Sequence, residues 1–409
     1  MRVCLAYGTG GLVVDLPGPP EHPPETTVVV TPEYREPAPD PRTALRTALR
    51  RPLAGPPLRE LVRPGQTVAI AACDGVQPQP RRLMVSAILA ELEGVVRLDD
   101  VTVLVATGAR RPHTTAEMRA MFGDRIADSL RIVSHDACDD ASLTWLGTHG
   151  DGVPVSLNSR WAGADVRVTT GLVEPHVFAG FRGGPKLVAP GLAGLETVLT
   201  LHDAERIAHP KARWGITYGN PVHDDIRAIA EATGVDFGLD VVLNRHQRVI
   251  GAYGGDVLVA HAAATATARR LSLRPVEGRF DVVVTTNAGH PLDRNLYQSV
   301  NGMRTAAEVV KPGGVIICAT ECRDGLTDHG RRTAVPDPWH AHMEATVRQR
   351  ARTIVHSAGL TATDLAAARL DHTDDVAASA RAALDEAGPE ARLCVLPEGP
   401  RTIPYVEAL

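Results

Sequence analysis

Residues 174–191, which read EPHVFAGFRGGPKLVAPG, combine a histidine, a lysine and several glycines. Gly183 and Gly184 allow the backbone to approach a ligand closely, and free N–H groups there can hold a phosphate. Lys186 offers a positive charge or an amine nucleophile. The spacing differs from a Walker A loop, because proline precedes this lysine and leucine follows it. The residues alone leave open a ligand-binding loop and a glycine-rich turn with a surface lysine.

Two histidines lie near this segment. His176 is inside it, and His202 follows Lys186 by sixteen residues on a predicted helix. Neutral imidazole is a common ligand of nickel, zinc and copper, and it is also the usual acid–base group near pH 7. The sequence therefore leaves open a metal site, an acid–base site and a purely structural role for His202.

Three further loops share one pattern: each follows a predicted buried strand and carries polar residues with glycine or proline. They are residues 74–78, 107–114 and 287–299. Open α/β sheets place their ligands at the C-terminal ends of parallel strands. We therefore expect these loops and residues 174–191 to line the functional site.

Strands that alternate with helices predict an α/β fold with mostly parallel sheets. The expected strands are residues 2–6, 12–16, 67–72, 101–106, 131–134, 165–170, 280–285, 314–320 and 393–396. The expected helices are residues 81–92, 114–121, 192–208, 258–271, 296–310, 343–349 and 376–387. Residues 236–244 and 248–252 have the pattern of a hairpin.

The same rhythm begins again near residue 277, which predicts two α/β domains. We expect residues 1–272 to form an N-terminal domain carrying the cofactor and metal motifs, and residues 273–409 to form a C-terminal domain. The active site is expected in an interdomain cleft, because two-domain proteins commonly bind ligands there. Trp339 lies in a predicted loop, where it could close over the ligand.

Composition excludes several classes of protein. The chain has 409 residues, 44% of them hydrophobic, and a net charge of −5, which does not fit a general nucleic-acid binder. The six cysteines form no CxxC pair. Neither a signal peptide nor a membrane-spanning run of apolar residues is visible, so we expect a cytoplasmic protein without a membrane partner.

The motifs together resemble the lactate racemase family. The resemblance rests on residues 174–191 with His202, on Asp74, and on the segments 108–112 and 289–302, in that order along the chain. Members depend on a nickel-pincer nucleotide, nickel pyridinium-3,5-bisthiocarboxylic acid mononucleotide. In this cofactor two sulfurs and a carbon hold nickel in a square-planar pincer. The resemblance implies two α/β domains with the cofactor between them.

The resemblance also implies roles for individual residues. Lys186 would tether the cofactor as a thioamide, His202 would be the protein's nickel ligand, and His176 would be a catalytic acid or base. The cofactor-binding residues that it implies are Asp74, Gly183, Gly184, Lys186, Pro190 and His202. The implied catalytic set is His176, Lys186 and the residue at position 110.

The sequence departs from the family where the substrate is expected. Arg110 stands in place of the second catalytic histidine, Gln77 in place of an arginine that pairs with the substrate carboxylate, and Asn301 in place of a lysine. Tyr297 and Gln298 match the family. These five positions are the expected substrate-binding residues.

Two explanations of these departures remain open. Arg110 could bind a substrate carboxylate from another side, with His113 or a water as second base. Alternatively, the substrate is a neutral, polyol-like or sugar-like secondary alcohol, because glutamine does not replace an arginine–carboxylate pair at equal strength.

The expected function is that of an isomerase: a racemase or epimerase that inverts a secondary-alcohol carbon by hydride transfer to the nickel-pincer nucleotide. A single-base oxidoreductase with the same cofactor and a non-catalytic cofactor-binding homologue are the alternatives. The expected partners are a small-molecule substrate and the enzymes of cofactor biosynthesis.

Overall fold

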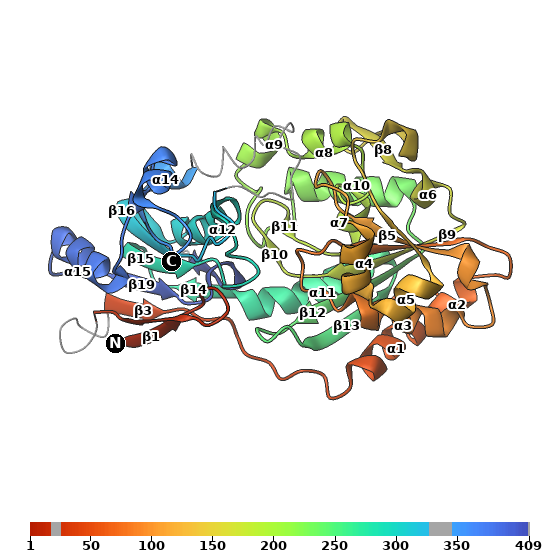
Figure 1. The fold of residues 1–409 in the computed structure, drawn as a ribbon, viewed down its shortest axis with the longest axis horizontal. Coiled ribbons are helices and arrows are strands. Elements are labelled where there is room, and N and C mark those ends of the chain that lie inside the picture. The colour runs from red at the N-terminus through yellow and green to blue at the C-terminus, as the bar shows by residue number, and fades with distance from the viewer. Residues whose placement is uncertain (18–25, 327–345, 408–409) are drawn as a thin grey trace. The chain divides into compact units, whose positions relative to one another are not determined.

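The computed structural model describes residues 1–17, 26–326 and 346–407, which fall into two α/β units (Figure 1). One unit contains residues 34–270. The other contains the described parts of residues 1–33 together with residues 271–326 and 346–407. Trp339 and part of the helix expected at residues 343–349 lie outside the described residues.

Residues 34–270 are built on a six-stranded sheet in the order β13-β12-β9-β4-β5-β6. The strands are β4 (Val68–Cys73), β5 (Val101–Ala106), β6 (Arg131–Ser134), β9 (Val166–Leu172), β12 (Phe237–Leu243) and β13 (Val249–Gly255). All neighbours are parallel except β12 and β13, which form the predicted hairpin. Every residue of β4 is buried, as expected of a parallel strand covered on both faces.

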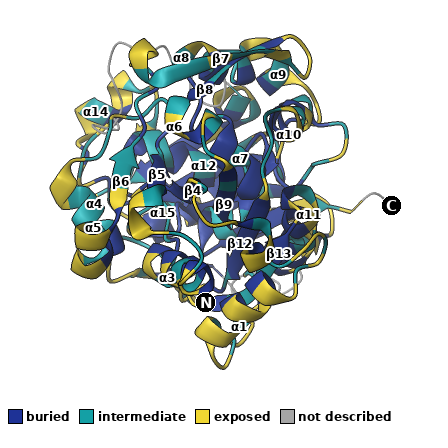
Figure 2. Cartoon of the chain, turned by 90° about the vertical axis from the view of Figure 1, so that its right-hand side faces the viewer, coloured by how far each residue is buried: buried dark blue, intermediate teal, exposed yellow. Residues whose placement is uncertain are grey.

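Helices and two small hairpins surround this sheet, with buried strands inside and exposed helix faces outside (Figure 2). The helices are α1 (Pro41–Arg50), α2 (Leu58–Leu61), α3 (Arg81–Leu92), α4 (Thr115–Phe122), α5 (Asp124–Ser129), α6 (Ser159–Ala162), α7 (Gly184–Val188), α8 (Leu195–Leu201), α9 (Ala204–Ala208), α10 (Pro221–Thr233) and α11 (Val257–Ser272). The hairpins pair β7 (Leu143–His149) with β8 (Val153–Asn158), and β10 (Pro175–His176) with β11 (Gly180–Phe181). Helix α7 packs on β4, β9 and β12, so the 174–191 segment lies directly on the sheet.

The other unit contains a second six-stranded sheet, all parallel, in the order β18-β17-β16-β15-β19-β3. Its strands are β3 (Thr27–Val29), β15 (Phe280–Thr286), β16 (Val310–Ala319), β17 (Ala351–His356), β18 (Asp371–His372) and β19 (Leu393–Leu396). The helices described here include α12 (Leu296–Ala307), α14 (Ala362–Ala367) and α15 (Val376–Ala387). Two small sheets pair β1 (Arg2–Leu5) with β2 (Leu12–Asp15), and β14 (Leu273–Val276) with β20 (Ile403–Val406).

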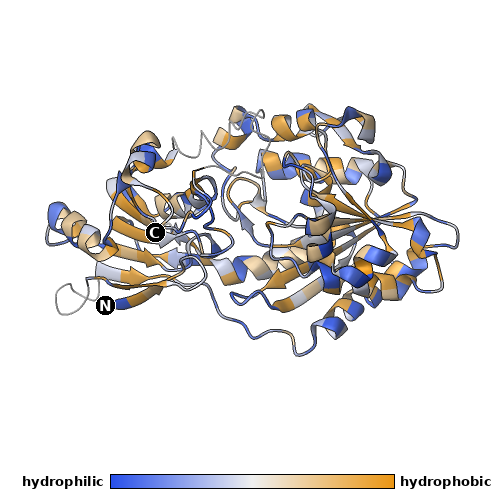
Figure 3. Cartoon of the chain, in the orientation of Figure 1, coloured by the Kyte–Doolittle hydropathy of each residue, from blue (hydrophilic) through white to orange (hydrophobic). Residues whose placement is uncertain are grey.

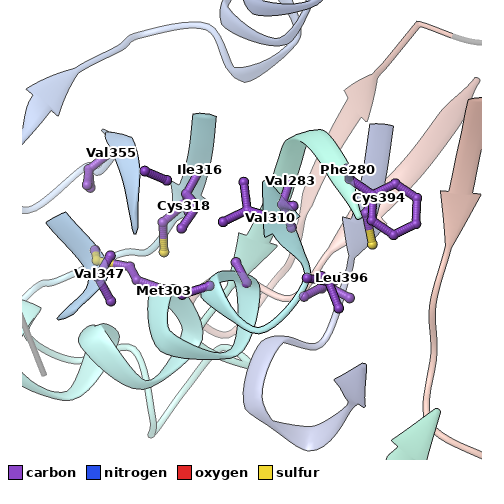
Figure 4. Close-up of a cluster of buried hydrophobic side chains, with 14 of the residues drawn as sticks. Phe280, Val283, Met303, Val310, Ile316, Cys318, Val347, Val355, Cys394 and Leu396 are labelled. Atoms are coloured by element: carbon purple, nitrogen blue, oxygen red, sulfur yellow. The ribbon is translucent and has the colours of Figure 1, made fainter. Parts of the chain in front are cut away.

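Alternation along β15 explains why this sheet is covered on both faces. Val283 packs in one cluster with Met303 of α12 (Figure 4), whereas Val282 and Val284 pack in a second cluster with residues of α15. Side chains of a strand alternate between faces, so a strand buried on both sides must be apolar throughout. Strands β15 and β19 are accordingly apolar over most of their length (Figure 3).

The fold class is as predicted, but two helices and the first domain differ from expectation. The helix predicted over 192–208 is broken into α8 and α9, and the helix predicted over 296–310 ends at Ala307, because β16 begins at Val310. Residues 1–33 belong with the C-terminal unit rather than with a 1–272 domain. The reason is that β3 adds to the second sheet beside β19.

Within the described ranges, no helix is both long and apolar enough to span a bilayer.

Candidate active site

Three of the four expected loops share one edge of the sheet in residues 34–270. Strands β5, β4 and β9 are parallel neighbours, so the loops that follow them emerge together. One contact joins two of these loops directly, since the Gly108 amide donates to the Gly191 carbonyl at 2.9 Å. In addition, the side-chain amide of Gln79, just after the loop that follows β4, donates to the Thr170 carbonyl of β9 at 2.5 Å. The fourth loop, residues 287–299, follows β15 in the other unit.

The segment 174–191 is shaped by its small hairpin and by a glycine turn. Strands β10 and β11 pair Pro175 with Phe181 and His176 with Gly180, and the chain then turns into α7 through residues 183–186, the 183–186 turn. Gly183 has φ +125°, and a Cβ there would lie 2.5 Å from Cγ2 of Val173. Only glycine fits this position without strain, so the sequence fixes the turn.

Phe178 brings three predicted site residues together. The His176 ring lies edge-on to the Phe178 ring with centroids 4.4 Å apart, and the His202 ring does the same at 5.0 Å. The Nζ atom of Lys186 is 5.6 Å from the Phe178 centroid. Phe178 is buried, whereas the three polar residues are half-buried. Lysine and two imidazoles thus surround one aromatic ring, which the sequence did not single out.

His202 lies at a break between helices and not within one. Helix α8 ends at Leu201, and α9 begins at Ala204 after Asp203 caps it by accepting a hydrogen bond from the Arg206 amide at 2.8 Å. Aspartate is a favoured N-cap, because its side chain satisfies an amide that the helix leaves free. The cap signal in the sequence is therefore what ends the predicted helix and places His202 beside Phe178.

Burial and neighbouring positive charges lower the pKa values of Lys186 and His176. Burial, reinforced by the positive charge of Arg182, lowers the pKa of Lys186 from 10.5 to about 7. Burial also lowers the pKa of His176 well below its usual value, with Lys186, Arg182 and His202 adding to the effect. The Nδ1 atom of His176 accepts a hydrogen bond from the Ala179 amide at 3.2 Å, so the neutral ring carries its proton on Nε2.

A buried carboxyl group stabilises the 183–186 turn by accepting a hydrogen bond from its backbone. Asp240 on β12 is fully buried, and its Oδ1 accepts a hydrogen bond from the Gly184 amide at 3.0 Å. Burial raises the pKa of Asp240 to about 7. A Cβ at Gly171 would overlap Asp240 Oδ1, so glycine at 171 makes room for the carboxyl. The sequence marks Asp240 as an aspartate within an otherwise apolar strand. It does not show that the partner of this carboxyl group is the Gly184 amide.

Two buried histidines form hydrogen bonds with the backbone of residues 179–183. His261 on α11 donates from Nε2 to the Arg182 carbonyl at 3.1 Å, and His223 on α10 bonds to the backbone of Ala179. Their rings lie 5.8 Å apart. Burial lowers the pKa of His223 to about 4 and that of His261 to about 3, so both are neutral at pH 7. They are structural supports of residues 179–183.

The loop after β4 contains an ion pair that involves two predicted residues. Nη1 of Arg110 lies 2.9 Å from Oδ2 of Asp74, which is buried. Arg81 binds the main-chain carbonyls of Cys73, Asp74 and Gln77, and so fixes the loop. The side-chain oxygen of Gln77 is buried without a hydrogen-bond partner among the described residues.

His113 lies in the same neighbourhood. Its Nε2 accepts a hydrogen bond from the Gly75 amide at 3.3 Å, and burial lowers its pKa, although Asp74 and Glu117 act in the opposite direction. His113 is therefore a neutral imidazole beside the loop that holds Asp74.

The remaining predicted residues lie on α12 of the other unit. Asn295 caps this helix by accepting from the Gln298 amide at 2.8 Å, and the Asn301 side chain donates to the Gln298 carbonyl at 2.9 Å. Tyr297, Gln298 and Asn301 are half-buried on the first turns of the helix. In the part of the chain that the structure describes, no group of three or more His, Cys, Asp or Glu residues could hold a metal ion.

Comparison with known proteins agrees with these motifs. Residues 18–215 match the family model described as the lactate racemase N-terminal domain, and residues 276–331 match the lactate racemase C-terminal domain. The chain is 31% identical over 325 residues to the lactate racemase of Thermoanaerobacterium thermosaccharolyticum, covering 74% of this chain and 76% of that one. The chain belongs to the lactate racemase family. It is accordingly a racemase, which is an isomerase.

Other relatives of the family extend the comparison. The lactate racemase of Lactiplantibacillus plantarum is 33% identical over 322 residues, covering 73% of this chain and 76% of that one. The solved structure of the Thermoanaerobacterium thermosaccharolyticum lactate racemase apoprotein superposes with a TM-score of 0.89 at 27% identity, over 99% of this chain and all of that one. A protein from Thermotoga maritima shares the fold, with a TM-score of 0.65 at 17% identity over 90% of this chain and 97% of that one.

Proposed function

We propose that this protein is a nickel-pincer nucleotide-dependent racemase or epimerase that inverts a secondary-alcohol carbon. The observation that carries the proposal is the grouping of His176, Lys186 and His202 around Phe178. The grouping supplies an acid–base group, an amine and an imidazole ligand. The substrate is a small molecule that is either 2-hydroxyacid-like or sugar-like, since the relatives are named for lactate and this chain differs at its expected substrate positions.

The residues present fit this cofactor. With a pKa of about 7, Lys186 is about half neutral at pH 7, as an amine must be to form a covalent link. The 183–186 turn lets the backbone approach a nucleotide closely, and Asp74 and Pro190 belong to the loops that flank it. A pincer would bring three donors of its own, so a single imidazole from the protein, that of His202, would be enough to hold the nickel.

When bound, the cofactor would supply the nickel-activated carbon that accepts the substrate hydrogen as hydride, and the protein would supply the proton transfers. The lowered pKa of His176 keeps its ring neutral at pH 7, which is the form that can accept a proton. In the structure its Nδ1 accepts a hydrogen bond from the Ala179 amide, so Nε2 carries the proton. To accept the substrate hydroxyl proton at Nε2, the ring would give up this hydrogen bond and carry its own proton on Nδ1, and the resulting imidazolium would then be the acid that returns the proton.

A racemase also needs a second proton-transfer group. Arg110 cannot act as a base at neutral pH, and it is paired with Asp74. His113 is the neutral imidazole in the same loops and is our candidate for the second base. The alternative favoured by the Arg110–Asp74 pair is a single-base oxidoreductase, which would release a stoichiometric keto product.

Production of the protein together with the enzymes of cofactor biosynthesis, in the cytoplasm where we propose that it works, would test this function. Intact-mass measurement should show an increment that is lost in Lys186→Ala, and metal analysis should show one nickel per chain. A substrate deuterated at the reacting carbon should keep its deuterium in the inverted product. Exchange of that deuterium into solvent would contradict hydride transfer and favour enolisation.

A further inference from the structure

We infer that Arg182 is the anion-binding residue of this site, and that it contacts an oxyanion of the bound ligand. The inference rests on the proposed function and concerns a residue that the sequence motifs did not assign. The oxyanion is the carboxylate of the substrate or the phosphate of the nucleotide. If it is the carboxylate, the substrate is a 2-hydroxycarboxylate and not a neutral polyol.

The backbone of Arg182 is held on both sides. Its amide donates to the Glu174 carbonyl at 2.8 Å, and its carbonyl accepts from His261 at 3.1 Å. The residue stands between β11 and the 183–186 turn, so its Cα is fixed relative to Lys186. A fixed anchor lowers the entropy that a long side chain loses when it binds a ligand.

The guanidinium group is only weakly engaged in the protein. Its Nε lies 3.4 Å from Oε1 of Glu174, and both side chains are partly exposed, at 31% and 34%. Nε is itself buried, yet among the described residues it has no hydrogen-bond partner. A guanidinium has five N–H donors and binds carboxylate or phosphate through two of them at once. The partial exposure leaves donors available to a ligand.

The charge around Arg182 favours an anion. Its positive charge reaches Lys186, His176 and Cys73, since it lowers the pKa of each of these groups. It therefore stands near both the 183–186 turn and the end of β4. Glu174 is the carboxylate paired with it, at an Nε–Oε1 distance of 3.4 Å, and an incoming oxyanion would compete with this carboxylate for the guanidinium.

Two other arginines near these loops, Arg110 and Arg81, already have partners within the protein. Arg110 is paired with Asp74 at 2.9 Å, and Arg81 binds main-chain carbonyls. The family positions that would carry cations hold Gln77 and Asn301. Arg182 thus supplies, from a different position, the kind of charge that those two substitutions remove.

Calorimetric titration of the apoprotein with lactate and with inorganic phosphate tests the inference. In Arg182→Gln, binding of one of the two probes should weaken about 10- to 100-fold, the range expected for charge-assisted hydrogen bonds. Loss of lactate binding alone identifies the substrate carboxylate. Loss of phosphate binding, with loss of the cofactor mass increment, identifies the nucleotide. Unchanged binding of both probes in Arg182→Gln would overturn the inference, as would a wild-type apoprotein that binds neither.

Two further variants keep the test decisive. Arg167→Gln removes a similarly buried arginine at the start of β9, where it pairs with Asp236 at 3.6 Å, and should leave binding of both probes unchanged. Glu174→Gln removes the competing carboxylate and should strengthen anion binding several-fold, even if Arg182→Gln does not fold. Weaker binding in Glu174→Gln would count against the inference.

The two proposals fail in different ways. A wild-type protein without nickel and without a mass increment refutes the proposed cofactor, while the titrations of apoprotein still report on Arg182. Arg182→Gln that keeps nickel and turnover with unchanged KM refutes the role of Arg182 and leaves the proposed function intact.

Discussion

The reactivity of Lys186 is the most direct consequence of its surroundings. Burial and the charge of Arg182 lower its pKa from 10.5 to about 7. At pH 7 about half of a group with that pKa is neutral, against roughly 0.03% at the ordinary lysine value, so the reactive form is enriched about 1,600-fold. In the apoprotein, Lys186 should therefore be acylated at pH 7 by a reagent that attacks neutral amines, with a half-maximal rate near pH 7.

The chain offers its own references for this assay. It contains three lysines, Lys186, Lys211 and Lys311, and the last forms an ion pair with Asp281 at 2.8 Å. Pulse labelling at a series of pH values, followed by peptide mass spectrometry, would give a separate rate profile for each. Lys186 is only partly exposed, so limited access of the reagent can lower its absolute labelling rate. The midpoint of the pH profile is therefore the quantity to compare.

Removing the positive charge of Arg182 should reverse only part of the pKa shift of Lys186. In Arg182→Gln the midpoint of Lys186 should rise, because a neighbouring positive charge is lost, but it should stay below 10.5, because burial is the larger cause. A wild-type midpoint near 10.5 would refute the argument from burial. A midpoint that falls in Arg182→Gln would refute the argument from charge.

Four further predictions concern the metal and the 183–186 turn. His202→Ala should lose nickel from the co-produced protein, and full metal content by elemental analysis would refute its assignment as ligand. Asp240→Leu leaves the Gly184 amide without an acceptor and should cost about 1–3 kcal/mol in denaturant unfolding, whereas Asp240→Asn should cost less. Because burial raises the pKa of Asp240 to about 7, the folded state binds its proton more tightly, so this group's contribution to stability should fall as pH rises from about 4 to 7. In Asp240→Asn this dependence of the unfolding free energy on pH should be absent. An unchanged dependence would refute its assignment to Asp240. Gly183→Ala should cost about 1–3 kcal/mol, since φ is +125° and Cβ would meet Val173; unchanged unfolding would count against a strained turn.

Sequence reasoning worked where a physical signal is local. Buried strands such as β5 and β19 have the predicted bounds, because a continuous apolar run in a parallel sheet differs from everything around it. The loops after β4, β5 and β9 could be placed at one sheet edge, because parallel strands end on the same side. Asp203 is a further local signal, because its capping role breaks the predicted helix at His202.

Contacts between distant segments had to come from the tertiary structure. No spacing rule connects Phe178 with His202, or Asp240 with the Gly184 amide 56 residues away along the chain. The same limit explains why the first 33 residues were assigned to the wrong domain: a three-residue strand carries too little pattern to reveal that it pairs with β19.

The sequence by itself determined the α/β class, the glycine turn with Lys186 and the residues that resemble the lactate racemase family. These features depend on residue type and on spacing over short distances. Only the tertiary structure decided that Lys186 has a low pKa, that Arg110 is paired with Asp74, and that the charge of Arg182 acts on both Lys186 and His176. Desolvation and charge–charge interactions act through space, so they depend on which segments the fold brings together.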